Sequence, residues 1–240
     1  MTHLQGKIAV VTGASAGIGA ATVRALAEAG AVPVLVARRA GRLEALMAEI
    51  GCGVACPLDL ADEAAPSALV EFVLARFGRV DLVIHNAGIL HVGTYADFDP
   101  ANLRQMIAVN YESIVRSSHL FARAMRAQGG GQIINISSIG AGIKAVGTGI
   151  YGGLKQALET FTDVLRVELA GSGIKVGLVA PGTTSTEIFE PMKAQGQPGW
   201  DSYIPALRPE DVARAVMFMA DQPPHANVAR LHVYSASEGF

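Results

Sequence analysis

The chain has 240 residues, 50% of them hydrophobic and 17% charged, with a net charge of −2. This composition predicts one folded domain over residues 1–240 and excludes a disordered chain, and the near-zero charge gives no support for nucleic acid or a membrane surface as a partner. The two cysteines, Cys52 and Cys56, are too few for a disulfide framework and indicate a reduced, cytoplasmic setting. We also expect neither a membrane-spanning helix nor a signal peptide.

Short apolar runs alternate with helical patterns along the chain. Such runs are typical of parallel strands buried on both faces, so the alternation predicts an α/β fold: a doubly wound parallel sheet, or Rossmann fold, with helices on both faces. The segment 182–205 breaks the alternation and is long for a connection, so we expect it to be a substrate lid. The predicted strands are 8–11, 32–37, 53–57, 80–84, 132–136, 174–179 and 228–233, and the predicted helices are 17–29, 42–50, 62–77, 101–128, 150–170 and 209–220.

A glycine-rich turn lies between the first predicted strand and the first predicted helix. In an open α/β sheet, ligands bind at the carboxyl ends of the strands, and glycines let the backbone approach a pyrophosphate that meets the amides of a helix N-terminus. No Gly-Lys-Ser/Thr follows, which argues against a phosphate loop of the ATPase type. We therefore predict a dinucleotide site, whose residues in the turn are Gly13, Ser15, Ala16, Gly17, Ile18 and Gly19.

The end of the second predicted strand indicates which dinucleotide binds. An acidic residue there would bond the adenosine ribose 2′-hydroxyl and repel a 2′-phosphate. The strand instead ends in Ala37, followed by Arg38 and Arg39. A guanidinium group offers a planar fork that suits a phosphate, so we predict NADP(H) as the cofactor and keep NAD(H) as the less favoured alternative.

Four polar residues form a candidate catalytic set. Tyr151 and Lys155 stand four residues apart at the start of a predicted helix, so the phenol and the ammonium share one face. The cation should lower the pKa of Tyr151 from about 10, which makes this residue a candidate general acid and base. Ser138 follows the fifth strand, and Asn110 lies inside a long helix, where asparagine is a poor helix former.

Together these motifs resemble the short-chain dehydrogenase/reductase family over nearly the full chain. The segment from Pro181 to Glu187, with Arg38 and Arg39, looks closest to an NADP-preferring bacterial branch that includes the clavulanate-aldehyde reductases. The resemblance rests on the glycine turn, Asn86-Ala87-Gly88, Asn110, Ser138, Tyr151-x-x-x-Lys155 and Pro181-Gly182.

This chain departs from the family pattern at several positions. Ala16 stands where many NADP-preferring members carry Lys or Arg, and His85 replaces the first residue of the usual Asn-Asn-Ala-Gly. Gly152 and Gly153 follow the tyrosine, and two glycines should loosen the first helical turn by about 1 kcal/mol each if they are exposed. None of these departures removes a catalytic group.

The resemblance implies a role for each matching residue. Tyr151 would be the general acid and base, and Lys155 would lower its pKa and bind the nicotinamide ribose. Ser138 would polarise the substrate oxygen, and Asn110 would hold a water in a proton relay. The remaining dinucleotide contacts that the resemblance implies are Asp59, Leu60, Asn86, Ala87, Gly88, Pro181, Gly182, Thr184 and Thr186.

The activity implied is NADPH-dependent reduction of a ketone or aldehyde, with alcohol oxidation as the reverse reaction. An NAD(P)+-dependent alcohol or hydroxy-acid dehydrogenase is the alternative within this class, and a non-catalytic dinucleotide-binding regulator is the alternative from another class. The non-redox dehalogenase offshoot of the fold is disfavoured because the glycine turn and Lys155 are intact. No metal site is expected, since no His/Cys/Asp cluster has ligand spacing.

The side chains flanking the catalytic set are mostly apolar, which predicts a fairly hydrophobic small-molecule substrate. Trp200 and Tyr203 are candidate lid residues, and Glu187 and Glu190 are expected to be solvated. The resemblance also implies a homo-oligomer, a tetramer or dimer, that packs through the helices predicted over 101–128 and 150–170. Candidate substrate contacts are Ile139, Val146, Ile188 and Phe189, with Leu90, His91, Ile143, Ile150 and Met192 as further pocket candidates.

Overall fold

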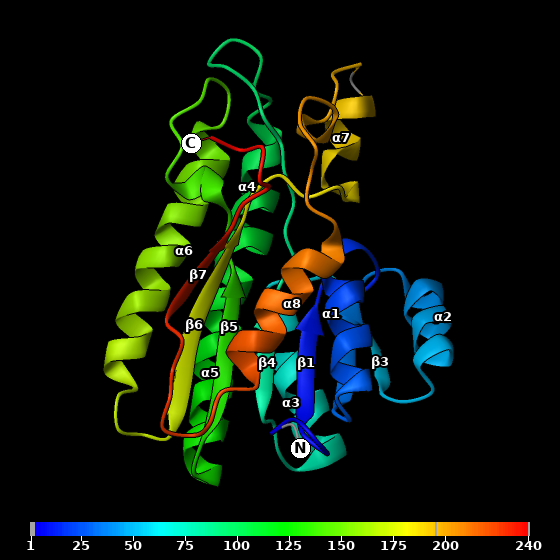
Figure 1. Ribbon diagram of the computed structural model, residues 1–240, viewed down its shortest axis with the longest axis vertical. Helices are drawn as coiled ribbons and strands as arrows, with labels where there is room; N and C mark the ends of the chain where they lie inside the picture. The colour runs from blue at the N-terminus through cyan, green and yellow to red at the C-terminus, as the bar shows by residue number, and fades with distance from the viewer. Residues whose placement is uncertain (1–2, 195, 240) are drawn as a thin grey trace.

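The computed structural model describes residues 3–194 and 196–239, and a seven-stranded parallel sheet forms its centre (Figure 1). The strand order is β3-β2-β1-β4-β5-β6-β7, which confirms the predicted doubly wound architecture. The strands are β1 (Ile8–Thr12), β2 (Val32–Ala37), β3 (Val54–Pro57), β4 (Leu82–His85), β5 (Gly131–Ile136), β6 (Ile174–Pro181) and β7 (Arg230–Val233).

Helices cover both faces of the sheet (Figure 1). Helices α1, α2 and α8 pack on one face, and α3, α5 and α6 pack on the other. The bounds are α1 (Gly17–Glu28), α2 (Ala40–Ile50), α3 (Ala65–Phe77), α4 (Ala101–Ile107), α5 (Ser113–Gln128), α6 (Gly149–Glu168), α7 (Glu190–Ala194) and α8 (Pro209–Ala220).

The position of β1 in the centre of the sheet explains why its sequence is apolar without interruption. Ala9 and Val11 point into the core beneath α1 and α8, whereas Ile8 and Val10 point into the core beneath α3 and α5. Successive side chains of a strand face opposite sides of a sheet, so a strand that is covered on both sides needs apolar residues at every position. The result is a rigid sheet whose carboxyl edge carries the polar residues of the candidate site.

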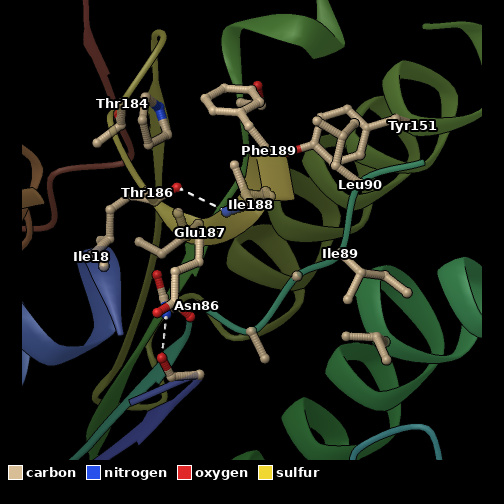
Figure 2. Close-up of a pocket in the computed structure, with 18 of the residues that line it drawn as sticks. Ile18, Asn86, Ile89, Leu90, Tyr151, Thr184, Thr186, Glu187, Ile188 and Phe189 are labelled. Atoms are coloured by element: carbon tan, nitrogen blue, oxygen red, sulfur yellow. Dashed lines mark hydrogen bonds between the residues drawn. The ribbon is translucent and has the colours of Figure 1, made fainter. Parts of the chain in front are cut away.

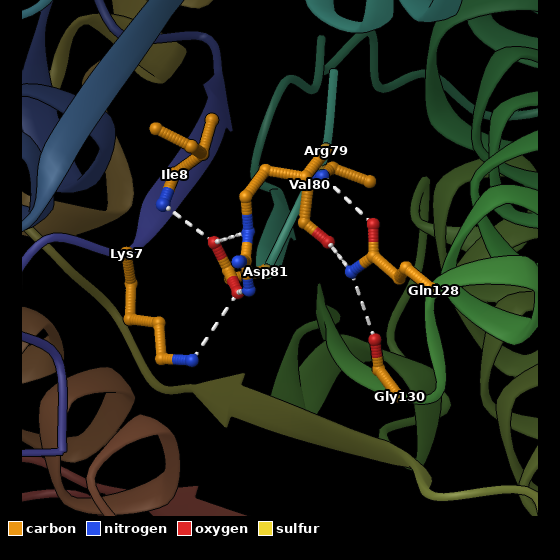
Figure 3. A network of polar contacts seen from close by, with 7 residues as sticks. All are labelled: Lys7, Ile8, Arg79, Val80, Asp81, Gln128 and Gly130. Carbon is orange, nitrogen blue, oxygen red and sulfur yellow. Dashed lines mark hydrogen bonds and ion pairs between the residues drawn. The ribbon is translucent and has the colours of Figure 1, made fainter. Parts of the chain in front are cut away.

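A polar network ties together the opposite edge of the sheet (Figure 3). The buried carboxylate of Asp81 accepts hydrogen bonds from the Ile8 amide at 2.9 Å and from Arg79 Nε at 3.1 Å, and it pairs with Lys7 at 3.3 Å. Burial opposes the ionisation of Asp81, but these donors outweigh it and lower its pKa. The amide group of Gln128 exchanges hydrogen bonds with the backbone of Val80, which fixes the end of α5 beside the start of β4.

The helix predicted over 101–128 is interrupted. A π-helical turn (Ala108–Glu112) separates α4 from α5 and contains Asn110. The amide of Asn110 donates to the Ile89 carbonyl at 2.9 Å and its oxygen accepts from the Ile89 amide at 3.1 Å. A single π turn inside a helix is common at functional sites, and here the wider turn accompanies the aiming of Asn110 at the chain that leaves β4.

The connection after β6 contains more structure than the sequence predicts. A 3₁₀ turn (Glu187–Phe189), the short helix α7 and a second 3₁₀ turn (Trp200–Ser202) lie within residues 182–205. These pieces are too short for a periodic pattern to reveal. Across residues 3–194 and 196–239, no helix combines the length and apolar character required to span a membrane.

Candidate active site

A cavity of about 1140 Å³ opens at the carboxyl edge of the sheet, where the strand order reverses between β1 and β4. This is the position at which open α/β sheets bind ligands. The cavity is lined by all the predicted dinucleotide contacts except Gly19: Gly13, Ser15, Ala16, Gly17, Ile18, Arg38, Arg39, Asp59, Leu60, Asn86, Ala87, Gly88, Tyr151, Lys155, Pro181, Gly182, Thr184 and Thr186.

The glycine turn is shaped to hold a pyrophosphate. Gly13 and Gly17 adopt left-handed φ angles of 69° and 53°, which only glycine takes without strain. Gly19 does not reach the cavity because it packs beneath the turn, where a Cβ would overlap the Gly13 carbonyl. Helix α1 begins after Ala16 without a side-chain cap and without an acidic residue in its first turn. Its first amides and its positive dipole end are therefore available to an anion, which fits a dinucleotide.

Asn86 joins the ends of β1 and β4 beside this turn. Its side-chain amide donates to the Thr12 carbonyl at 2.9 Å, and its backbone amide donates to Thr12 Oγ1 at 3.0 Å. These bonds hold the two strand ends together at the point where the sheet would otherwise open. Asn86 thus shapes the cavity wall in addition to lining it.

The far end of the cavity is basic, and the carboxylate of Glu187, from the connection after β6, lies against it. Arg39 donates to Ser15 Oγ at 2.8 Å and pairs with Glu187 at 2.6 Å, and Arg42 pairs with the other oxygen of the same carboxylate. Arg38 is more exposed and lies 4.0 Å from Asp59. The guanidinium groups of Arg42 and Arg39 hold the pKa of Glu187 below its usual range. Glu187 is exposed, as the sequence analysis expected, and the 3₁₀ turn in addition aims its carboxylate at the start of α2.

The catalytic candidates meet at the other end of the cavity. Tyr151 lies buried in the first turn of α6, and Gly152 brings that turn against the loop that follows β5. A Cβ on Gly152 would lie 2.8 Å from the Gly140 carbonyl, so only glycine permits this approach. Ser138 caps the same loop by accepting from the Gly140 amide at 3.0 Å. The loop and the helix are therefore locked together at Ser138 and Tyr151.

The pKa of Tyr151 moves in the direction opposite to the sequence prediction. Burial raises it to about 12, and a hydrogen bond with Ser138 opposes that rise. Lys155 Nζ lies 5.8 Å from the centre of the Tyr151 ring and donates its hydrogen bond to the Ile136 carbonyl at 2.9 Å. The prediction was wrong because it counted the neighbouring cation and ignored the desolvation of the phenol.

Lys155 is itself a buried cation. Burial lowers its pKa to about 8, and the charge of Glu159 opposes that shift. A Cβ added to Gly88 would lie 3.0 Å from Asn110 Oδ1 and 3.8 Å from Lys155 Nζ, so this glycine leaves space between the two polar groups. Asn110 does not line the cavity directly, whereas Ser138, Tyr151 and Lys155 do.

The space in front of Tyr151 is mostly apolar. Figure 2 shows Leu90 and Phe189 on the same side of the cavity as Tyr151, while Ile18 and Asn86 lie at the dinucleotide end. Phe189 and Trp200 from the lid stack edge to face, 5.7 Å apart. The predicted residues that line the cavity are Leu90, His91, Ile139, Ile143, Ile188, Phe189, Trp200 and Tyr203.

Three pocket candidates do not line the cavity. Val146 is 88% exposed and is a correction to the predicted substrate contacts. It lies in the loop just before the turn at Gly147, and Ala145 and Thr148 face the cavity in its place. Ile150 and Met192 pack behind the lining side chains. Proximity to Tyr151 in the sequence was a poor guide here because this loop has no regular side-chain period.

Sequence reasoning also missed residues that the fold brings to the cavity. Arg42 lies in the first turn of α2, three residues after the N-cap Arg39, so the arginines that precede the helix could have indicated it. Gln105 comes from α4, and no local motif marks it. Within the part of the chain that the structure describes, no group of His, Cys, Asp or Glu side chains is arranged to hold a metal ion.

A dinucleotide cleft that ends on a buried tyrosine and lysine defines a class of protein: an oxidoreductase that uses a nicotinamide cofactor. Residues 7–197 match the family model described as short chain dehydrogenase, and the chain belongs to this family.

Relatives of known name cover almost the whole chain. A farnesol dehydrogenase of Aedes aegypti is 34% identical, with 100% of both chains covered. A probable NADP-dependent dehydrogenase of Haemophilus influenzae is 32% identical over 97% of this chain and 94% of its own. Among solved structures, the closed form of a serine dehydrogenase complexed with NADP+ matches with a TM-score of 0.90 at 27% identity, covering 97% of this chain and 96% of the other.

Proposed function

We propose that the protein is an NADP(H)-dependent oxidoreductase that reduces the carbonyl group of an apolar aldehyde or ketone, and that oxidises the corresponding alcohol in reverse. The observation that carries this proposal is the polarity of the one cavity. Arg38, Arg39 and Arg42 line one end, whereas Tyr151 and Lys155 line the other beneath an apolar lid.

The basic end supports NADP(H) over NAD(H). A 2′-phosphate needs donors that an NAD ribose does not, and the guanidinium groups of Arg38, Arg39 and Arg42 supply them. Asp59 accepts the Ala61 amide at 3.0 Å and follows β3, not β2, so it does not take the place of the acidic residue that blocks a 2′-phosphate. The relative from Haemophilus influenzae and the matched serine dehydrogenase are both named with NADP, which agrees with this assignment.

The chain's own residues supply position and a proton. When bound, NADPH would supply the hydride. Tyr151 is buried and keeps its proton at neutral pH, so it acts as the acid that protonates the substrate oxygen. Ser138 polarises that oxygen, and the ammonium of Lys155 stabilises the phenolate that Tyr151 becomes. Asn110, held by Ile89, lies beside Lys155 at the point where a relay to solvent would begin.

The lining near Tyr151 supports an uncharged substrate. Lys155 is the one cation among the described residues at this end of the cavity, and it belongs to the catalytic group. Glu190 also lines the cavity, and it is 61% exposed and paired with Lys193 at 3.3 Å, so it offers a carboxylate substrate no positive partner. This arrangement disfavours the hydroxy-acid alternative, and it agrees with the name of the Aedes aegypti relative, a dehydrogenase of the apolar alcohol farnesol.

A substrate panel tests the proposal. The purified protein is assayed with NADPH against medium-chain aldehydes, apolar ketones and 2-oxo acids of matched length, and with NADP+ against the corresponding alcohols. We expect turnover of the apolar compounds and little turnover of the acids. Turnover of the acids alone would support the hydroxy-acid alternative, and NADPH binding without any turnover would support the non-catalytic regulator.

Several further predictions form part of this proposal. We propose that residues 182–205 act as a lid, because Ile188, Phe189 and Trp200 line the cavity. Val164 and Val167 on α6 are exposed, which supports packing of a dimer or tetramer through that helix. The narrower resemblance to the clavulanate-aldehyde reductase branch and the cytoplasmic location stay predictions.

A further inference from the structure

A buried carboxylate lies next to the catalytic group and has no part in the reaction as proposed. Glu159 is on α6, one helical turn after Lys155, so the two side chains lie on the same face of the helix. The side chain of Glu159 is 8% exposed. A buried carboxylate is costly unless it is paired, and retaining one beside a buried lysine calls for an explanation.

Two partners fix the Glu159 carboxylate. Ser137, the residue before Ser138, donates its hydroxyl to Glu159 Oε1 at 2.8 Å. Arg230, from β7, forms an ion pair with Glu159 Oε2. Arg230 also pairs with Asp163 at 2.8 Å, one turn further along α6, where the side chain is half-exposed. The carboxylate is therefore held between the end of β5, which leads to Ser138, and the last strand of the sheet.

The surroundings of Lys155 contain few other charges. Tyr151 lies on the same helix and is neutral below its raised pKa. His85, on β4, is fully buried, and burial lowers its pKa to about 3, so it is uncharged at neutral pH. Asn110 and the Ile136 carbonyl contribute dipoles and no charge. Arg230 and Asp163 act at longer range through their pairing with Glu159, which leaves Glu159 as the charge that opposes the burial of Lys155.

We propose that Glu159 is a positioning residue that keeps Lys155 protonated, and that Ser137 and Arg230 hold its carboxylate in place for that purpose. The proposal rests on the proposed function, because the ammonium of Lys155 matters only where Tyr151 exchanges a proton. Its physical basis is that a fixed negative charge one turn away stabilises a buried cation far better than it would in water.

A titration of Lys155 tests the proposal without any substrate. The chain has lysines at positions 7, 144, 155, 175 and 193, so isotope-labelled lysine gives few NMR signals, and the Lys155 signal is assigned by its loss in Lys155→Met. We expect Glu159→Gln to lower the pKa of Lys155 by about one unit, the lower end of what one neighbouring charge produces. Glu159→Asp should restore most of the shift. An unchanged Lys155 titration in Glu159→Gln would overturn the proposal.

Asp163→Asn is the matched control. It removes the same charge from the same helix and the same partner, Arg230, but its side chain is 44% exposed, so solvent screens its effect on Lys155. We expect the pKa of Lys155 in this variant to equal that in the wild type. If Glu159→Gln does not fold, the double variant Glu159→Gln, Arg230→Met removes both members of the buried pair, and a smaller downward shift is expected, because the loss of the Arg230 cation partly offsets the loss of the carboxylate.

The pH profile of carbonyl reduction gives the functional readout. Loss of the Lys155 proton ends the stabilisation of the Tyr151 phenolate, so the alkaline limb of kcat/KM should move to lower pH in Glu159→Gln, again by about one unit. A purely structural role would reduce kcat/KM at every pH and leave the limb in place. A wild type without turnover would refute the proposed function, and the NMR titration would still decide the role of Glu159.

Discussion

The two glycines after Tyr151 are neighbours in sequence but differ in their surroundings, which makes them a matched pair of test sites. Gly152 is buried, and a Cβ there would lie 2.8 Å from the Gly140 backbone carbonyl. Gly153 is exposed, and a Cβ there would meet no atom within 4 Å. Neither glycine has a positive φ, so alanine fits the backbone conformation at both positions.

The expected effects of alanine have opposite signs. Gly153→Ala should stabilise the fold by about 0.5–1 kcal/mol, because alanine loses less backbone entropy in a helix. Gly152→Ala gains the same helical term but forces a methyl group onto a backbone carbonyl, which costs about 1–3 kcal/mol. The net loss is therefore about 1 kcal/mol, within a range of about 0–2.5 kcal/mol. The same clash pushes the first turn of α6 away from the Ser138 loop, so kcat should also fall.

Urea denaturation and steady-state kinetics measure both effects. We expect the urea concentration at the midpoint of unfolding to rise for Gly153→Ala, with kcat unchanged. For Gly152→Ala we expect that concentration to fall and kcat to be reduced. Equal stabilisation by the two alanines would show that α6 does not approach Gly140 as closely as the structure has it. The account of how Tyr151 is placed beside Ser138 would then be refuted.

Three other variants test the charges of the cavity. Arg38→Ala should weaken NADPH binding by about 10-fold and NADH binding hardly at all, because an exposed charge-assisted hydrogen bond contributes at the lower end of its energy range. Calorimetry measures both affinities, and equal losses of NADPH and NADH affinity would show that Arg38 does not bind the 2′-phosphate. Glu187→Gln should tighten NADPH by about 2- to 5-fold and leave NADH unchanged, because it frees Arg39 and Arg42 from a competing carboxylate; weaker NADPH binding would contradict this. The pKa of Lys155 is about 8 in the folded protein and 10.5 in the unfolded chain, so the unfolded state binds more protons between these two pH values. The free energy of unfolding should therefore rise with pH in this range, by about 3 kcal/mol in total and by about 2 kcal/mol between pH 7.5 and pH 10. Lys155→Met should lack that rise in urea titrations, and parallel stability curves for the two proteins would argue against a buried, charged lysine.

Most of the fold could be predicted because the central strands are covered on both faces. That arrangement requires uninterrupted apolar runs such as Ile8 to Val11, and these stand out against helical periods. The break between α4 and α5 could not be predicted in this way. The π turn keeps the helical pattern of apolar residues almost intact, and it accompanies the contact of Asn110 with Ile89, which lies in the connection after β4.

The residues that line the predicted dinucleotide end of the cavity were predictable because they sit at fixed places at the ends of strands. Gly13 and Asn86 directly follow β1 and β4, Pro181 ends β6, and parallel strands bring those ends to one edge. The substrate side was less predictable. Val146 lies in an irregular loop and Phe189 in a short 3₁₀ turn. Phe189 packs in a cluster that includes Leu90 and Trp200, whereas Val146 faces solvent.

The pKa of Tyr151 shows a further limit of reading a sequence. The spacing of four residues correctly places Lys155 on the same face of the helix as Tyr151. How deeply the phenol is buried depends on the Ser138 loop and the lid, which come from other parts of the chain. Desolvation of the phenol outweighs the hydrogen bond with Ser138, so the pKa of Tyr151 rises instead of falling.

The most direct test of the central claim is single-turnover oxidation of bound NADPH by an apolar aldehyde, compared between the wild type and Tyr151→Phe. Phenylalanine preserves the ring and its packing and removes only the hydroxyl, so NADPH affinity should stay close to that of the wild type. General acid catalysis contributes about 10²- to 10⁴-fold, and we expect the rate of hydride transfer to fall by at least about 100-fold. A rate in Tyr151→Phe within about 10-fold of the wild type would show that another group protonates the substrate, and would contradict the role assigned to Tyr151.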